Sequence, residues 1–184
     1  AELALAAGDF TAALGFTDRA QATGASTEGD IAAELLAIRA DAWQWSHDAV
    51  RSYEAARQAI AIARAGSKSY GRAMGAAISG ALFLRRNDAL DVLMPELYRA
   101  KPDEDAIPVL SSAFSSAIIV LLVMGRRDAA ERFLQRMQDV VAPSLGREAS
   151  VAGRFDYARA YWHRVVERDP SAALALDREA AAHF

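Results

Sequence analysis

Small apolar residues recur along this chain at a fixed spacing. The dipeptide Ala-Ile stands at positions 37–38, 77–78 and 117–118, which is a period of about 40 residues. In each copy small residues occupy positions 33, 37 and 40, 73, 77 and 80, or 113, 117 and 120. Residues spaced i, i+4 and i+7 lie on one stripe of an α-helix. The pattern therefore predicts a repeated helix whose small-residue stripe packs closely against its neighbours.

The polar and turn-forming residues between the apolar segments divide the chain into helices that follow one another in pairs. The predicted helices cover residues 1–7, 11–22, 30–45, 48–65, 67–86, 88–100, 108–124, 128–141, 144–167 and 171–184. A Gly-, Ser- and Thr-rich loop at 23–29 and a Pro-containing loop at 101–105 separate units. We expect an all-α domain, a right-handed solenoid of about five antiparallel helix pairs, with units at 1–25, 26–66, 67–105, 106–143 and 144–184.

Residues that favour helix ends support this division. Between the two helices of each unit stands a residue whose side chain can accept from the free amides of a helix start, and the predicted N-caps are Thr11, Asp48, Asp88, Asp128 and Ser171. Gly8 and Gly66 are expected to end helices. Pro95 falls inside a predicted helix, where its missing amide predicts a kink over residues 91–94.

Composition narrows the class of protein. The 184 residues are 53% hydrophobic with a net charge of −3, which fits a well-buried domain and disfavours nucleic-acid binding, since that needs a concentrated basic face. The lack of cysteine fits a cytoplasmic protein. The longest apolar run, residues 117–124, is far shorter than the roughly 20 residues that span a bilayer, so we expect a buried helix and no membrane contact.

The two ends of the sequence also carry expectations. The chain begins without Met inside a predicted helix and stops inside another, so we expect a fragment of a larger protein. The terminal helices of a truncated array expose apolar faces, which predicts self-association through them.

Catalytic and metal-binding patterns are lacking. Gly71, Gly75 and Gly80 lie in a helical stretch without the lysine of a phosphate-binding loop, and we expect them to permit close packing. The three histidines have no ligand spacing, and the acidic loop at 103–105 lacks the spaced oxygen ligands of a calcium site. The aspartates are explained as helix caps. We therefore expect no enzyme activity, no metal and no cofactor.

The segment Gly8-Asp9-Phe10-Thr11-Ala12-Ala13-Leu14, followed by Ala20, resembles the turn and second helix of a tetratricopeptide repeat. Residues 125–130 form a looser second copy, and the period of about 40 exceeds the usual 34. This long variety is similar to helical arrays in large bacterial regulators, such as MalT-like transcriptional activators and arrays attached to serine/threonine kinases. The resemblance implies a protein or peptide interaction module for signalling or transcription regulation, with its first helices lining a concave face.

Three pairs of residues at i, i+4 spacing share repeat columns on the first helices and form the candidate groove: Arg39 with Trp43, Ser79 with Phe83, and Arg159 with His163. On a groove, aromatic side chains give apolar contact area and arginines bind peptide carboxylates. In the competing interpretation Trp43 and Phe83 belong to the core and the arginines to its solvated edge. Tyr157, Tyr161 and Trp162 share that ambiguity.

Two other functions remain open at the sequence level. In a small-ligand sensor of a transcriptional regulator, a closed pocket lined by Arg39, Trp43 and Phe83 would bind a metabolite and shift neighbouring domains. An all-α enzyme is the third alternative. An open groove would favour peptide binding over the sensor.

Overall fold

The computed structural model describes residues 1–24 and 29–183, and within them the chain is all helical, without a β-strand. The α-helices are α1 (Glu2–Ala6), α2 (Phe10–Ala22), α3 (Gly29–Trp45), α4 (Ala49–Ile62), α5 (Lys68–Phe83), α6 (Asn87–Arg99), α7 (Ile107–Val123), α8 (Arg127–Val141), α9 (Ala149–Trp162) and α10 (Pro170–Ala182). A 3-10 turn, η1 (Glu104–Ala106), precedes α7, and a π-helical turn, η2 (His163–Glu167), continues α9. The predicted all-α class is confirmed. Most of the predicted loop at 23–29 lies outside the described residues.

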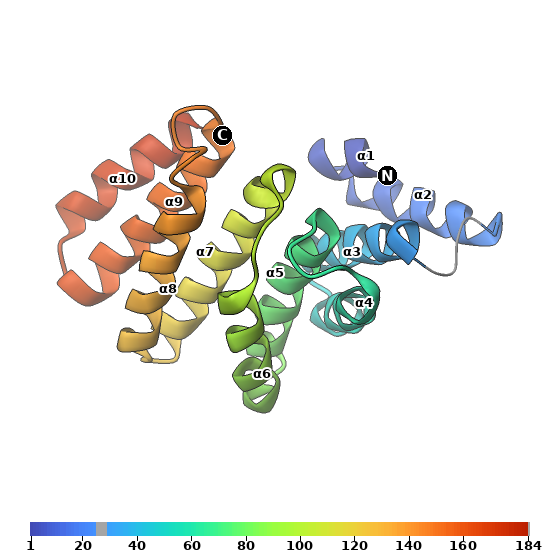
Figure 1. Cartoon of the computed structure of the whole chain (residues 1–184), viewed down its shortest axis with the longest axis horizontal. Helices are drawn as coiled ribbons and strands as arrows, with labels where there is room; N and C mark the ends of the chain where they lie inside the picture. Colours follow the sequence, from blue (N-terminus) through green and yellow to red (C-terminus); the bar gives the residue numbers. More distant parts are fainter. Residues whose placement is uncertain (25–28, 184) are drawn as a thin grey trace.

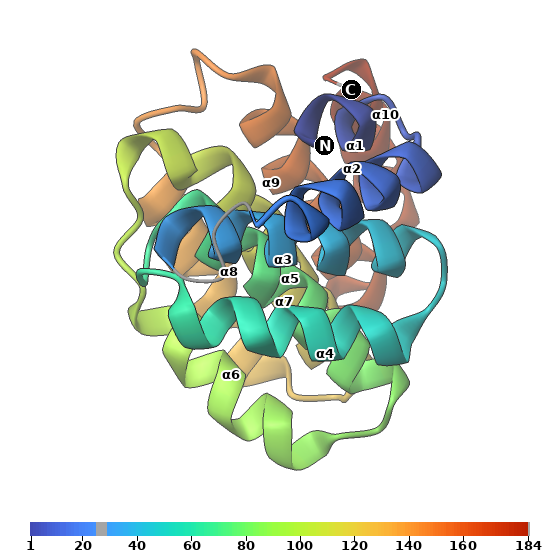
Figure 2. The same ribbon diagram turned by 90° about the vertical axis from the view of Figure 1, so that its right-hand side faces the viewer.

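The helices α3, α5, α7 and α9, called the first helices below, pack against one another in series. Each is followed by a partner, α4, α6, α8 or α10. Figure 1 shows this succession from the blue N-terminal to the red C-terminal end. In Figure 2, turned by 90°, α3, α5 and α7 lie one behind another while α4 and α6 lie together on one side of them. The right-handed superhelix of five pairs stays a prediction.

The turn inside each helix pair repeats one backbone conformation. Gly8, His47, Arg85, Gly125 and Arg168 all have a positive φ, between 55° and 74°. A left-handed residue at this place ends a helix and reverses the chain, and the residue after it occupies the N-cap position of the next helix. Gly8 thus ends α1 as predicted. The turns recur about every 40 residues, in register with the small-residue pattern.

The predicted N-caps are confirmed at one position only. The side chain of Asp48 accepts a hydrogen bond from the Arg51 amide at 3.0 Å. Thr11 and Ser171 are wrong, because the caps of α2 and α10 are Asp9 and Asp169, each placed directly after the left-handed residue.

Asp88 and Asp128 are also not caps. Arg86 and Arg126 take the cap positions of α6 and α8, and their side chains make no capping hydrogen bond. The chain reverses at residues 85 and 125, so each aspartate falls in the first helical turn, where its charge favours the positive end of the helix dipole.

Several helix ends differ from the predicted ones, and two of the differences have a clear local cause. The helix α4 ends at Ile62 instead of Ala65, because Ala63 is extended, with ψ 140°, and Gly66 is left-handed. The helix α9 begins at Ala149 instead of Ser144, since the Ser144 carbonyl accepts from two nearby amides in a turn. Pro95 lies inside α6 as predicted.

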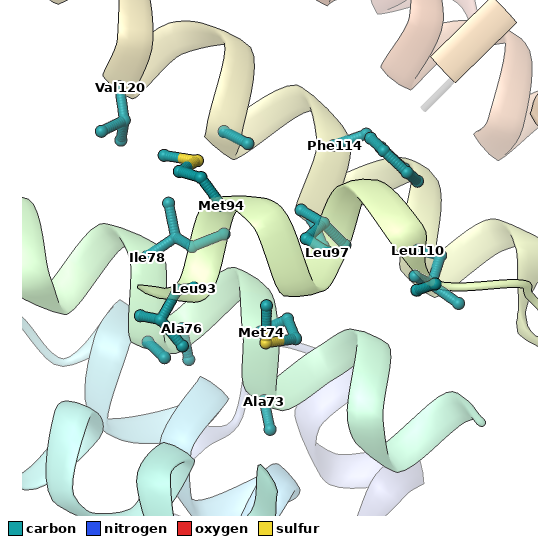
Figure 3. Packing of buried hydrophobic residues seen from close by; sticks show 14 of the residues in the cluster. Ala73, Met74, Ala76, Ile78, Leu93, Met94, Leu97, Leu110, Phe114 and Val120 are labelled. Carbon is teal, nitrogen blue, oxygen red and sulfur yellow. The ribbon is translucent and has the colours of Figure 1, made fainter. Parts of the chain in front are cut away.

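The central core lies between α5, α6 and α7. Buried side chains from the three helices meet there, as Figure 3 shows, and among the large ones are Met74, Ile78, Leu93, Leu97, Leu110 and Phe114. Ile38, Ile78 and Ile118 are buried as predicted. The 20-residue stretch Glu104–Val123 is apolar and long enough to cross a bilayer, with a hydropathy of 2.3, but 67% of it is buried inside the protein. One mostly buried helix of this kind is weak evidence for a membrane span.

Glycines let α5 approach neighbouring helices closely at two of the three expected positions: Gly71 faces α7, and Gly80 faces α4. A Cβ at Gly71 would lie 2.9 Å from Cγ of Leu110, and one at Gly80 would lie 3.0 Å from Cβ of Tyr53. Both approaches are closer than ordinary side-chain contacts, which confirms that these glycines permit close packing. A Cβ at Gly75 would lie 3.6 Å from Cα of Ala113, an ordinary contact.

Candidate functional site

Four first helices meet around one small polar cavity, called the inner cavity below. Its volume is about 90 Å³, and α3, α5, α7 and α9 all contribute lining residues. The polar ones are Asp41, Gln44, Trp45, Arg72, Ser112, Ser116 and Arg154, and glycine, alanine and valine complete the lining. Helices that are far apart in the sequence therefore surround one small hollow.

Helical periodicity explains which residues reach the cavity. Asp41 and Trp45 are four residues apart on α3, as are Ser112 and Ser116 on α7, so each pair lies on one side of its helix. On α5 the residues beside Arg72 at this spacing are Gly75 and Ala76. Their small side chains leave room for the arginine between neighbouring helices.

Arg72 lies in the inner cavity with only 14% of its side chain exposed. Its Nη2 donates to Oε1 of Glu2, on α1, at 2.9 Å. Its Nε lies 4.0 Å from Oδ2 of Asp41. Its Nη1 is buried and has no hydrogen-bond partner within residues 1–24 and 29–183. Such a buried unpaired donor costs about 1–3 kcal/mol, so an acceptor placed beside Nη1 would be bound favourably.

Asp41 is the carboxyl of the inner cavity and is partly buried, with 28% of its side chain exposed. Burial raises the pKa of this carboxyl above its ordinary value, while the charge of Arg72, a hydrogen bond with Trp45 and the charge of Arg154 act in the lowering direction. Burial also lowers the pKa of Arg154, against the charges of Asp41 and Tyr157. The lining therefore combines two guanidinium groups with one carboxyl whose ionisation burial disfavours.

Exposed apolar side chains continue the cavity-lining stripes toward the C-terminal ends of three first helices. Trp45 is 53% exposed, Phe83 74% and Val123 57%. Phe83 follows Ala76 by seven residues on α5, and Val123 follows Ser116 by seven on α7, so each continues a lining stripe by two turns. We call Trp45, Phe83 and Val123 the apolar rim.

A second cavity connects the rim with the polar residues. Its volume is about 250 Å³, and its lining includes His47 and Ser52 as well as Phe83 of the rim. Gln44 lines both this cavity and the inner cavity, so the two adjoin. Polar and apolar contacts are thus available side by side.

The candidate groove residues of α3 lie elsewhere. Arg39 and Trp43 line a cavity of about 460 Å³ on the side of α3 that faces α2 and α4. Arg39 pairs with Asp18 at 2.9 Å and donates to Gln21 at 2.5 Å. The guanidinium of Arg51 lies 4.7 Å from the centre of the Trp43 ring.

The other predicted residues divide between two places. Ser79 and Phe83 share the stripe of Arg72 on α5, and Phe83 belongs to the rim. Arg159 lies 3.5 Å from Asp156 on its own helix. Nδ1 of His163 lies 2.6 Å from Oε2 of Glu167, although without hydrogen-bond geometry. The six residues thus do not line one common cavity, and only Phe83 adjoins the inner one; their binding roles stay predictions.

The sequence analysis missed Asp41, Arg72 and Arg154. None of these charged residues lies in the repeat columns from which the candidate groove was predicted. Arg72 gave a usable signal, because its helical neighbours Ser69, Gly75 and Ala76 are all small. A long charged side chain on a stripe of small residues has space for neighbouring helices to enclose it.

No group of three or more His, Cys, Asp or Glu residues in the described part of the chain is placed to hold a metal ion. Comparisons with protein-family models, with curated proteins and with solved structures find no match for this chain. The functional assignment therefore depends on the geometry of the site.

Proposed function

We propose that this chain is a non-catalytic interaction module that binds a peptide segment of a partner protein along the concave side of its first helices. The observation that carries the proposal is the apolar rim beside the inner cavity. Three large apolar side chains, Trp45, Phe83 and Val123, are exposed on the same helical stripes as the enclosed polar residues.

This combination matches how peptides are held. Exposed apolar side chains lose water on binding and supply most of the favourable free energy, while a few polar groups fix orientation. Rows of aligned first helices provide a long surface for such contacts. The turn that recurs about every 40 residues supports a superhelix of repeats, and the resemblance to tetratricopeptide arrays supports a place in a bacterial regulator.

One observation favours a second candidate, a small-ligand sensor. Four first helices contribute to a single cavity, so a ligand there would connect distant parts of the chain. The small volume of about 90 Å³ favours the peptide module, since whole metabolites occupy pockets of roughly 300–1,000 Å³.

A random-peptide display selection tests the proposal. Peptides that the unchanged chain selects are synthesised, and their dissociation constants are measured by fluorescence anisotropy. We expect a Phe83→Ser/Val123→Ser variant to bind them at least about tenfold more weakly, because the rim supplies the apolar contact. The control is Val92→Ser, which changes an equally exposed apolar residue on α6, a second helix. Selected peptides that bind the rim variant as tightly as the unchanged chain would refute the proposal.

A further inference from the structure

We propose that Arg72 anchors an acidic side chain of the bound segment, and that Glu2 of α1 occupies this anchor in the free chain. The inference rests on the proposed function and specifies the chemistry of the partner. Its elements are one guanidinium, its present carboxylate partner and the charges around them.

Only one of the two Nη groups of Arg72 donates a hydrogen bond within the described residues. Nη2 donates to Glu2, whereas Nη1 is buried without a partner in the described part of the chain, and Nε is 4.0 Å from Asp41. A guanidinium binds a carboxylate best through two parallel N–H donors. A carboxylate that replaced that of Glu2 and moved slightly deeper would accept from Nη1 and Nη2 together.

The surrounding charges select an anion of small size. Arg72 and Arg154 contribute two guanidinium groups to the lining, against the single carboxyl of Asp41. Ser112 and Ser116 add hydroxyl donors to the lining. A cavity of about 90 Å³ holds a carboxylate with part of its side chain, while the rest of the ligand extends over the rim.

Glu2 is an occupant that a ligand can replace. Its carboxylate remains 58% exposed in the pair with Arg72, and exposed ion pairs stabilise a fold only slightly. The helix α1 has five residues, none of them buried. The Glu2 pair shows that this guanidinium already donates to a carboxylate from another segment of the chain.

Titration with a capped glutamate, N-acetyl-glutamate N-methylamide, tests the inference on the full chain. The readout is the Nε–H resonance of Arg72 in an arginine-labelled sample, with capped glutamine as the neutral ligand of the same shape. We expect saturable shifts with capped glutamate only. Sodium acetate and inorganic phosphate are titrated separately to distinguish a carboxylate site from a general anion site.

Two substitutions with matched controls locate the binding. In Glu2→Gln the competing carboxylate is absent, so the dissociation constant of capped glutamate should fall about two- to fivefold. Glu34→Gln, at an exposed glutamate of α3, should leave it unchanged. By calorimetry, Arg72→Lys should bind at least about tenfold more weakly, because an ammonium lacks the two-donor fork. Arg178→Lys, at an exposed arginine of α10, is its control.

Each outcome separates this inference from the proposed function. Equal shifts with capped glutamate and capped glutamine, tighter binding of phosphate than of carboxylates, or an unchanged constant in Glu2→Gln would overturn the inference. The peptide acetyl-Glu-Leu-Ala-Leu-amide, which repeats residues 2–5, adds apolar side chains to the glutamate. If capped glutamate binds at Arg72 but this peptide binds no more tightly than capped glutamate, the acidic anchor stands and peptide binding along the rim fails. If the affinity of the selected peptides depends on the rim but not on Arg72, the proposed peptide binding stands and the acidic anchor fails.

Discussion

Two glycines on one helix should respond in opposite directions to the same substitution. Gly71 and Gly75 both lie in α5 and both face α7. In each case alanine gains about 1 kcal/mol of helix propensity. The difference between the two variants therefore reports the space that the neighbouring helix leaves for one methyl group.

At Gly71 that space is lacking. The added Cβ would lie 2.9 Å from Cγ and 3.2 Å from the backbone nitrogen of Leu110, and the Leu110 side chain is fully buried. Overpacking of a tight core costs about 1–3 kcal/mol, which cancels or exceeds the propensity gain. At Gly75 the nearest atom is 3.6 Å away, so the gain is kept.

We therefore expect Gly75→Ala to raise the free energy of unfolding by up to about 1 kcal/mol and Gly71→Ala to lower it by about 0–2 kcal/mol. Urea denaturation followed by circular dichroism measures both, provided that the dependence on urea concentration is the same in both variants. A Gly71→Ala protein as stable as the Gly75→Ala protein would refute the assigned approach of α5 and α7.

Two further predictions concern aspartates. Asp48→Ala should lower the free energy of unfolding by about 0.5–2 kcal/mol, because it removes an observed helix cap. Asp88→Ala should lower it by only about 0.3–1 kcal/mol, because the charge of Asp88 lies in the first turn of α6 and does not cap the helix. Equal losses of the two variants in urea denaturation would contradict the cap assignment. Burial raises the pKa of Asp41 above 3.8, so the folded chain holds this proton more tightly than the unfolded chain, and stability is lost as pH rises through the folded pKa. The stability of Asp41→Asn relative to the unchanged chain should therefore increase between about pH 4 and 7, and a constant difference would argue against the buried carboxyl.

The sequence was sufficient to locate the helices, because the spacing of small and apolar residues that indicates a helix is a local property of the chain. The spacing of small residues located α3, α5 and α7 to within a few residues, and the glycine interpretation was correct at Gly71 and Gly80. The caps were harder. At 85 and 168 the left-handed turn residue is arginine, a type with no preference for that conformation, so the start of the following helix was not visible there. At Gly8 and Gly125 the turn residue was visible, but the cap was assigned two residues too late.

The site was decided by tertiary structure, and α3 shows why. Arg39 with Trp43 and Asp41 with Trp45 are equivalent sequence patterns, each a charged residue followed by tryptophan four residues later. They lie about 200° apart around the helix. Neither pattern indicates which side faces the other first helices. The packing of α2 and α4 on one side of α3, and of α5 on the other, turned Asp41 and Trp45 toward the inner cavity. Local spacing determines which residues share a helical face, but only the neighbouring helices determine which face becomes a site.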